Sequence, residues 1–122
     1  MTAYQRPILL VHRDRELLVA ASGARLLLAL SEAQSRSGTA HLVLTGGGMG
    51  SAILAGAGAS GLLGLVDWGR LHVWWGDERY LPTGHPDRND TQNRAALLDS
   101  LPLDPAKVHA VAGPDRSGSV HE

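Results

Sequence analysis

Short apolar runs alternate along the chain with longer segments in which apolar residues recur at helical spacing. The apolar runs predict strands at residues 8–11, 41–45, 71–75 and 107–111, and the helical spacing predicts helices over residues 15–35, 51–65 and 91–100. Strands that alternate with helices are typical of an α/β domain built on a mostly parallel sheet. We therefore expect the strands to lie in one sheet, joined by right-handed crossovers.

The first two predicted helices differ in how well the sequence supports them. Asp14 is predicted as the N-cap of the first helix, because its carboxylate can accept hydrogen bonds from free N–H groups of the first turn. Gly38 is a natural C-terminal stop for the same helix. The second helix contains Gly56, Gly58, Gly61 and Gly64, each of which costs roughly 1 kcal/mol relative to Ala. We expect that helix to depend on tertiary packing.

The composition limits the class of protein. The 122 residues suffice for one compact domain. The chain has 11 Lys and Arg against 12 Asp and Glu, so its net charge of −1 favours neither a nucleic acid nor an anionic membrane as partner. The chain has no cysteine, which excludes disulfides, Cys-ligated zinc and a thiol nucleophile. No apolar window reaches the ~20 residues of a transmembrane helix, and we expect a cytoplasmic protein.

A run rich in glycine, residues 46–50, follows the second predicted strand. Ligands of parallel sheets bind beyond the carboxyl ends of the strands. Glycines there let the backbone approach a ligand, and the free N–H groups at the start of the next helix favour an anion. The spacing matches neither the dinucleotide fingerprint nor the Walker loop. Two interpretations stay open, a phosphate or carboxylate site and a tight strand-to-helix turn.

Three consecutive charged residues, Asp77, Glu78 and Arg79, follow the third predicted strand. The planar guanidinium of Arg79 suits a phosphate. The two carboxylates could hold Arg79 in place or act on a substrate. A solvated loop with internal ion pairs explains the same residues without a function. Because this loop and the glycine loop are predicted at the same sheet edge, the functional interpretation is favoured.

The histidines and tryptophans are mostly predicted to be structural. His41, His72 and His109 lie in or beside predicted strands, where a histidine is usually a hydrogen-bonded structural residue. No His-x-x-x-His pair indicates a zinc site, and no metal is expected. His85, in the loop after Arg79, is the one histidine to test as functional. The tryptophans predicted as core or subunit-contact residues are Trp68, Trp74 and Trp75.

Five segments of the sequence carry a family resemblance. They are Val-Leu-Thr-Gly-Gly-Gly at 43–48, Val-Asp-Trp-Gly-Arg-Leu-His-Val-Trp-Trp-Gly-Asp-Glu-Arg-Tyr-Leu-Pro at 66–82, His-Pro-Asp-Arg-Asn at 85–89, Ala-Ala-Leu-Leu at 95–98 and Lys-Val-His-Ala-Val at 107–111. Together they closely resemble the 6-phosphogluconolactonase family. The resemblance implies hydrolysis of 6-phosphoglucono-1,5-lactone to 6-phosphogluconate in the oxidative pentose phosphate pathway, with no cofactor. It also implies the three-layer, Rossmann-like, mostly parallel sheet shared with glucosamine-6-phosphate deaminase and ribose-5-phosphate isomerase. The deaminases have Asp-Glu-Tyr where this chain has Asp-Glu-Arg.

The resemblance implies substrate-binding residues in both loops. The family's strand-end loop borders the sugar phosphate, its Arg contacts the phosphate, its acidic pair shapes the site, and a downstream Asn belongs to a Ser-Asn step. The matching residues here are Thr45, Gly46, Gly47, Asp77, Glu78, Arg79 and Asn89. The sequence departs from the family pattern at two places: Arg88 replaces the usual Ser, and Met49-Gly50 replaces the Thr/Ser-Pro of many members.

The larger departure concerns the general base. In the family this base is a His in a Gly-x-Asp-Gly-His block of the C-terminal half, and no such block occurs in this sequence. His85 follows Thr-Gly and His121 follows Ser-Val, so neither matches, and no catalytic residue is assigned in this chain. Residues 1–115 therefore resemble the N-terminal half of a lactonase domain, and residues 116–122 are expected to be a polar tail.

Three interpretations of the chain follow. It is a lactonase represented only in part, a half-length protein that binds a sugar phosphate without turnover, or a structural remnant. The expected partner is a phosphorylated sugar lactone. Self-association through an exposed sheet edge is also expected, because a parallel sheet normally has both faces and its edges covered.

Overall fold

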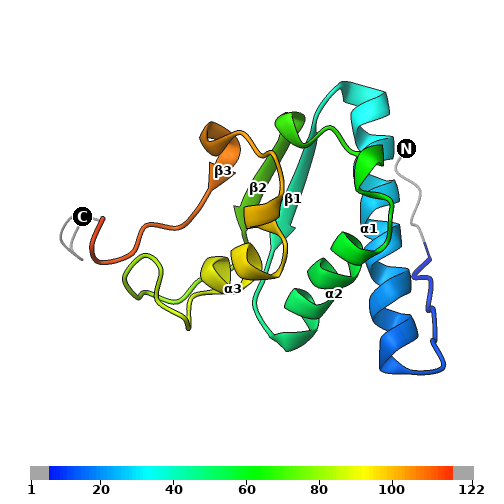
Figure 1. Cartoon of the computed structure of the whole chain (residues 1–122), viewed down its shortest axis with the longest axis horizontal. Coiled ribbons are helices and arrows are strands. Elements are labelled where there is room, and N and C mark those ends of the chain that lie inside the picture. The colour runs from blue at the N-terminus through cyan, green and yellow to red at the C-terminus, as the bar shows by residue number, and fades with distance from the viewer. Residues whose placement is uncertain (1–5, 117–122) are drawn as a thin grey trace.

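The computed structural model describes residues 6–116, which form a parallel sheet with helices packed beside it (Figure 1). The helices are α1 (Arg15–Ser37), α2 (Gly48–Ala59) and α3 (Asn89–Ala96), and the strands are β1 (Ala40–Leu44), β2 (Leu71–Trp75) and β3 (Val108–His109). Short 3₁₀ turns lie at Leu63–Leu65, Trp68–Arg70, Leu98–Ser100 and Pro105–Lys107. The strand order β1-β2-β3, parallel throughout, confirms the expected α/β class. None of the described helices combines the length and the apolar character needed to span a bilayer.

The boundaries of α1 follow the predicted signals. The Asp14 carboxylate accepts a hydrogen bond from the Leu17 backbone N–H at 2.8 Å. Gly38 closes the helix with a φ of 82°, a left-handed conformation that favours glycine, and its N–H donates to the Gln34 carbonyl at 2.7 Å. Both boundary predictions are confirmed.

Glycines allow α1 and α2 to pack closely against each other, as Figure 1 shows. A Cβ at Gly23 would lie 2.6 Å from the backbone nitrogen of Ala57, and a Cβ at Gly56 would lie 2.7 Å from Cγ1 of Val19. Neither position has room for a larger residue unless the helices move apart. The expected dependence of the second helix on tertiary packing is therefore visible at this contact.

The predicted span of that helix, residues 51–65, is wrong at both ends. α2 begins at the glycine loop and ends at Ala59, because Gly61 takes a φ of 77° and turns the chain toward the 3₁₀ turn Leu63–Leu65. Of the four glycines that were expected to destabilise this helix, only Gly56 and Gly58 lie within α2.

The side chains of β1 and β2 alternate between two faces of the sheet. The face toward the helices carries the buried residues Ala40, Leu44, Leu71, Val73 and Trp75. The opposite face carries His41, Val43, His72 and Trp74, and Val43 is 61% exposed there. Within residues 6–116, the sheet is therefore packed on one face and largely open on the other.

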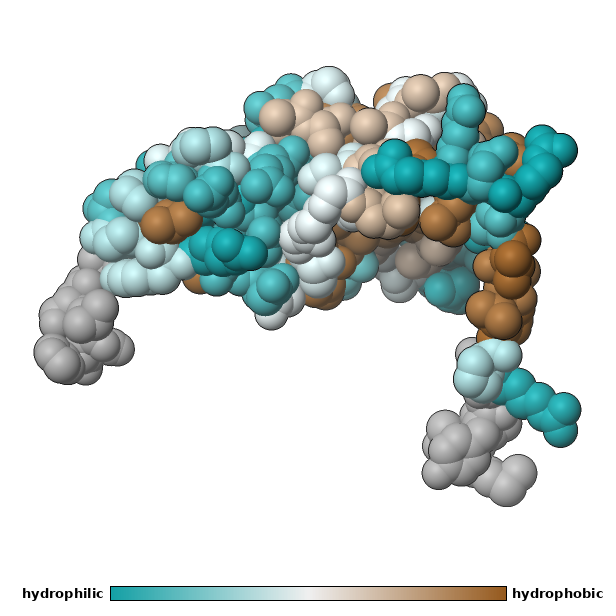
Figure 2. All heavy atoms as spheres, turned by 90° about the horizontal axis from the view of Figure 1, so that it is seen from below, coloured by the Kyte–Doolittle hydropathy of each residue, from teal (hydrophilic) through white to brown (hydrophobic). Residues whose placement is uncertain are grey.

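The strand predicted at residues 8–11 is wrong. Ile8 and Val11 are each 84% exposed, and no strand of residues 6–116 pairs with this segment, which runs beside α1 in Figure 1. Figure 2 shows the segment as hydrophobic surface exposed at one end of the molecule. A four-residue apolar run favours a strand, but it does not identify the neighbour that would hydrogen-bond to it.

The last two predicted elements are shorter than expected. β3 spans two residues in place of 107–111: the 3₁₀ turn Pro105–Lys107 takes up the first predicted position, and pairing with β2 ends at His109. α3 begins two residues before the predicted start and gives way to the 3₁₀ turn Leu98–Ser100. Of the predicted polar tail, only Arg116 lies within the described residues.

Candidate functional site at the carboxyl ends of the strands

The two loops predicted to form a site leave the sheet at the same edge. Leu44 pairs with Trp75 across β1 and β2, and the Gly76 N–H donates to the Leu44 carbonyl at 2.9 Å. Residues 45–50 and 76–79 therefore begin side by side at the carboxyl ends of parallel strands. This confirms the predicted placement of the loops.

Glycine is required at two positions of the first loop. Gly47 precedes α2 with a φ of 96°, a region that favours glycine. At Gly46 the restriction is space, because a Cβ there would lie 2.6 Å from Cγ and 2.9 Å from Nδ2 of Asn89. The tight-turn interpretation accounts for this geometry, and an anion site at the loop stays a prediction.

Asn89, the first residue of α3, connects the two loops. Its side-chain amide lies against Gly46, and its Nδ2 donates to the Asp77 carbonyl at 3.2 Å. Asn89 is buried, so these contacts are shielded from water. The structure thus gives this predicted site residue a role in holding the loops together.

The Glu78 carboxylate is buried at the start of α3. Its Oε1 accepts hydrogen bonds from the backbone N–H groups of Asn89 at 2.6 Å and Arg79 at 2.8 Å, and its Oε2 accepts from the Asp90 N–H at 2.9 Å. The Glu78 side chain is 1% exposed. A carboxylate is favourable here because the first N–H groups of a helix have no partner within the helix. Glu78 is therefore engaged in positioning α3.

Arg88 is the buried centre of the second loop. Its Nε donates to Asp90 Oδ1 at 2.8 Å, its Nη1 to the Leu81 carbonyl at 3.1 Å and its Nη2 to the Val111 carbonyl at 2.6 Å. The same Nη2 lies 3.9 Å from Glu78 Oε2. The hydrogen bond to Asp90, with the charges of the nearby carboxylates, raises the pKa of Arg88. Arg88 thus fixes the loop to the segment that follows β3.

Sequence reasoning missed this role of Arg88. A charged residue in a polar loop is normally solvated, and the sequence marked Arg88 only as a departure from the usual Ser. The available signal was the Asp two residues later, which could pair with it. The carbonyl acceptors Leu81 and Val111 come from distant positions that only the fold brings together.

Asp90 joins Arg88 to Arg94. Its Oδ1 accepts from Arg88, and its Oδ2 accepts from Arg94 Nε at 3.3 Å. Burial alone would raise the pKa of Asp90, but the hydrogen bonds and charges of the two arginines outweigh it, so the pKa is lowered. One buried carboxylate is therefore shared by two guanidinium groups.

Four predicted site residues stay exposed at the sheet edge: Thr45, Gly47, Asp77 and Arg79. Within residues 6–116, no carboxylate forms an ion pair with the Arg79 guanidinium. The prediction that the acidic pair could hold this guanidinium therefore finds no support, since Glu78 instead accepts from the Arg79 backbone N–H. The exposed guanidinium of Arg79 therefore stays open to an anionic ligand.

Four histidines, His41, His72, His85 and His109, make structural contacts. His85 Nδ1 accepts from the Asp87 N–H at 3.0 Å within its own turn. On the open sheet face, Trp74 Nε1 donates to His41 Nδ1 at 3.1 Å, and His72 Nδ1 lies 3.0 Å from His109 Nε2. No group of three or more His, Asp or Glu side chains among residues 6–116 is arranged to hold a metal ion. Trp68 and Trp75 lie in the core, as predicted, while Trp74 is partly exposed.

Comparison with known proteins defines the family. The model of the family described as glucosamine-6-phosphate isomerases/6-phosphogluconolactonase matches residues 13–121. The chain is 52% identical over 109 residues to 6-phosphogluconolactonase of Streptomyces coelicolor and 41% identical over 102 residues to that of Mycobacterium tuberculosis. The solved structure of 6-phosphogluconolactonase from Trypanosoma brucei superposes with a TM-score of 0.70 at 24% identity, over 95% of this chain and 45% of that chain, and supports the fold. The chain belongs to the glucosamine-6-phosphate isomerase/6-phosphogluconolactonase family.

The matches cover most of this chain but less than half of each relative. They include 89% of this chain and 42% of the Streptomyces protein, and 84% of this chain and 40% of the Mycobacterium protein. The chain therefore spans about two fifths of the length of these relatives.

Proposed function

We propose that this chain is the N-terminal part of a 6-phosphogluconolactonase, an enzyme that hydrolyses 6-phosphoglucono-1,5-lactone to 6-phosphogluconate. The observation that carries the proposal is the exposed Arg79, at the sheet edge where the glycine loop also begins, whose guanidinium forms no ion pair within residues 6–116. The chain that carries it is 52% identical to a 6-phosphogluconolactonase over 109 residues. The Arg after Asp-Glu also favours a lactonase over a deaminase, because deaminases have Tyr there. Residues 1–115 are proposed to form this part of the lactonase domain.

In this proposal the predicted site residues divide into two groups. Arg79 binds the substrate phosphate through charge-assisted hydrogen bonds, and Thr45, Gly47 and Asp77 border the sugar from the exposed sheet edge. Gly46, Glu78 and Asn89 act as positioning residues, since their contacts hold the loops and the start of α3 in place. This division supplies a binding surface for a phosphorylated sugar and needs no cofactor.

The proposal assigns no general base to this chain. The family's Gly-x-Asp-Gly-His block does not occur in the sequence, and His85 is engaged in a turn. We therefore place the base in the part of the relatives that this chain does not span. A sugar-phosphate-binding protein without turnover is the second candidate, because the binding residues are present and the base is not.

Binding of 6-phosphogluconate tests the phosphate role. Calorimetry with the full chain is expected to detect weak binding of 6-phosphogluconate and none of gluconate, which lacks the phosphate. Arg79→Ala is expected to lose about 1.5–3 kcal/mol of binding free energy, the range for a hydrogen bond to a charged group. Arg25→Ala, on the exposed side of α1, makes the same charge change as a control. Equal affinity of the chain and Arg79→Ala would contradict the assignment.

A further inference from the structure

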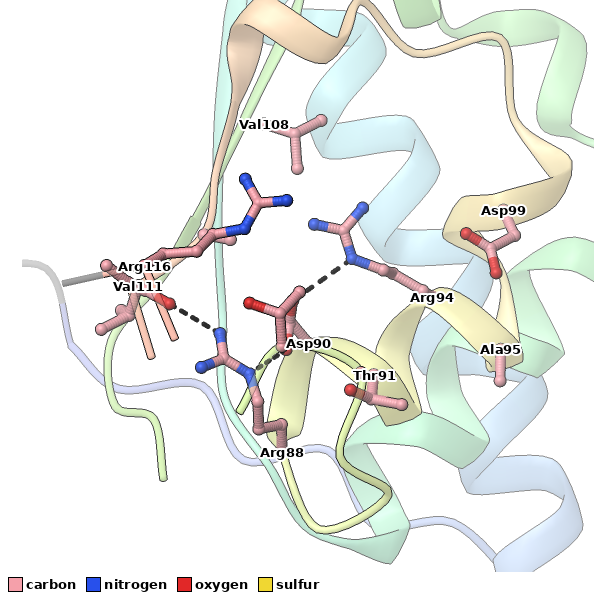
Figure 3. Close-up of a pocket in the computed structure, with 13 residues that line it drawn as sticks. Arg88, Asp90, Thr91, Arg94, Ala95, Asp99, Val108, Val111 and Arg116 are labelled. Atoms are coloured by element: carbon pink, nitrogen blue, oxygen red, sulfur yellow. Dashed lines mark hydrogen bonds and ion pairs between the residues drawn. The ribbon is translucent and has the colours of Figure 1, made fainter. Parts of the chain in front are cut away.

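A second site is suggested by a cavity of about 650 Å³ between α3 and the segment that follows β3 (Figure 3). The α3 side contributes Arg88, Asp90 and Arg94, and the facing segment contributes Val111 and Arg116. The volume lies within the range of small-molecule sites. The cavity lining shares Arg88 and Asp90 with the interior of the second loop, but it includes neither Arg79 nor the glycine loop, to which substrate binding is assigned above.

The side chains that line the cavity include more cations than anions, while the Glu78 carboxylate, outside the lining, lies 3.9 Å from Arg88 Nη2. The lining holds three arginines against two carboxylates, those of Asp90 and Asp99. Asp90 is already shared by Arg88 and Arg94 at 2.8 and 3.3 Å. Arg116 forms no ion pair with any carboxylate of the described residues. The neighbouring Asp115 carboxylate interacts with the charge of Arg116 but forms no ion pair with it, so the Arg116 guanidinium has no direct carboxylate partner in the described chain.

Two guanidinium groups in this cavity have free donors. Figure 3 shows Arg94 and Arg116 turned toward the same space. Arg94 uses its Nε to bind Asp90, and neither its Nη groups nor the Arg116 guanidinium donates a hydrogen bond to the described part of the chain. Like charges in one cavity repel each other, and an anion between them would replace that repulsion with attraction.

The backbone that carries Arg116 is held in place. The Asp115 carboxylate accepts from the Thr83 N–H at 2.8 Å and from the Thr83 hydroxyl at 3.3 Å, and the Arg116 N–H donates to the Gly113 carbonyl at 3.0 Å. A Cβ at Gly113 would lie 3.0 Å from Arg88 Nη1, so this segment packs directly on the buried arginine. A preformed cavity lowers the ordering cost of binding.

We propose that this cavity binds the phosphate group of a small molecule between Arg94 and Arg116. A tetrahedral phosphate presents oxygens in several directions and can accept from two guanidinium forks at once, whereas a carboxylate fills only one fork well. This assignment does not rest on the proposed lactonase function, because it uses none of the residues placed in that site.

The test is a titration of the ¹⁵N-labelled full chain with inorganic phosphate, followed by NMR at an ionic strength held constant with chloride. We expect saturable shifts of the Thr83, Gly113 and Arg116 amides. Arg116→Ala should weaken binding about tenfold or more, as expected for loss of a charge-assisted contact. Arg25→Ala on α1 should leave it unchanged. Asp99→Asn, which removes the unshared carboxylate of the lining, should tighten it.

Two further ligands distinguish the source of the phosphate and the class of anion. If glucose 6-phosphate binds as phosphate does, a phosphate monoester fits the cavity; if only inorganic phosphate binds, the assignment to a small-molecule phosphate group is overturned. Malonate binding more tightly than phosphate would overturn the choice of phosphate.

The location of the shifts tests the cavity itself. Shifts confined to residues 45–50 and 76–79 and abolished by Arg79→Ala would overturn this cavity site while supporting the lactonase site. Unchanged affinity in Arg116→Ala would overturn it as well.

Discussion

The side-chain amide of Asn89 lies so close to Gly46 that a Cβ at residue 46 would be 2.6 Å from Asn89 Cγ. Gly46 lies in the loop after β1 and Asn89 is the first residue of α3, 43 positions later in the sequence, so their contact joins the end of β1 to the start of α3. Because Asn89 also donates to the Asp77 carbonyl, this one contact fixes the spacing of both loops at the sheet edge. The geometry of the proposed substrate site therefore depends on the buried side chain of Asn89.

Gly46→Ala is expected to destabilise the chain by about 1–3 kcal/mol, the usual cost of inserting a group into a packed site. The new methyl group would have to displace the buried Asn89 amide and with it the start of α3. Thermal unfolding measures the loss. Gly48→Ala is the matched control, since a Cβ at Gly48 meets no atom within 4 Å. Equal melting temperatures for the two variants would contradict the packing argument.

Glu78→Gln tests the role of the buried carboxylate in positioning α3. The amide keeps one acceptor oxygen but loses the charge that faces Arg88 and the N–H groups of Asn89 and Asp90. We expect a loss of about 1–3 kcal/mol in the free energy of unfolding, as for leaving buried polar groups poorly paired. Glu32→Gln, on the exposed surface of α1, is the control in denaturant titrations. If both variants unfold at the same denaturant concentration, Glu78 does not have this structural role.

The three neighbouring histidines on the open sheet face, His41, His72 and His109, predict that the folded chain is less stable in mild acid. The pKa of His72 is lowered from 6.5 by desolvation and by the charges of His41, His109 and Lys107, against a raising effect of Asp104. Since the unfolded chain binds this proton more readily than the folded chain, stability is fully present above pH 6.5 and falls as the pH drops below it. The melting temperature should therefore decrease from pH 7 toward pH 5.5.

The cause of that pH dependence is tested with matched substitutions. His72→Gln should weaken it, because the titrating ring is removed, and His12→Gln, outside the sheet, should keep it. Trp74, whose ring lies 3.8 Å from that of His109, gives a fluorescence signal for the same transition. A melting temperature that stays constant or rises on acidification would show that His72 is not protonated preferentially in the unfolded chain.

Self-association through the sheet stays a prediction, and the structure identifies residues to test. Val43 is 61% exposed on the open face of β1, next to the partly exposed Trp74 on β2. We expect sedimentation to show concentration-dependent association. Val43→Lys should reduce this association, because burying the lysine charge in a contact between two copies of the chain costs free energy. Leu28→Lys, at an exposed apolar position of α1, should leave association unchanged. A monomer at all concentrations would contradict the prediction.

The sequence was sufficient to predict the boundaries of α1 and the parallel strand order that brings the two loops to one edge of the sheet. The N-cap at Asp14, the stop at Gly38 and the parallel order of the later strands depend on local signals and on general rules of chain connection. The strand at residues 8–11 failed because strand pairing is a long-range property that a short apolar run does not encode.

The interior of the candidate site was much less predictable. Glu78 looked like a ligand-binding carboxylate, yet its partners are backbone N–H groups of a helix that begins 11 residues later. Arg88 looked like a chance departure, yet its donors reach carbonyls of Leu81 and Val111. The partners of Glu78, and two of the three hydrogen-bond acceptors of Arg88, are backbone atoms. Every residue type carries these atoms, so a pattern of side chains reveals only the pairing of Arg88 with Asp90.

Lactone hydrolysis is the most direct measurement of whether this chain supplies the substrate-binding part of a lactonase. The assay compares the chain alone with the chain joined to the C-terminal part of a relative that carries the Gly-x-Asp-Gly-His block, against the spontaneous rate. We expect turnover only from the joined protein, and at least about tenfold less from its Arg79→Ala variant, as for loss of a charged contact to the phosphate. Turnover by the chain alone, or full activity of the joined Arg79→Ala variant, would contradict the account.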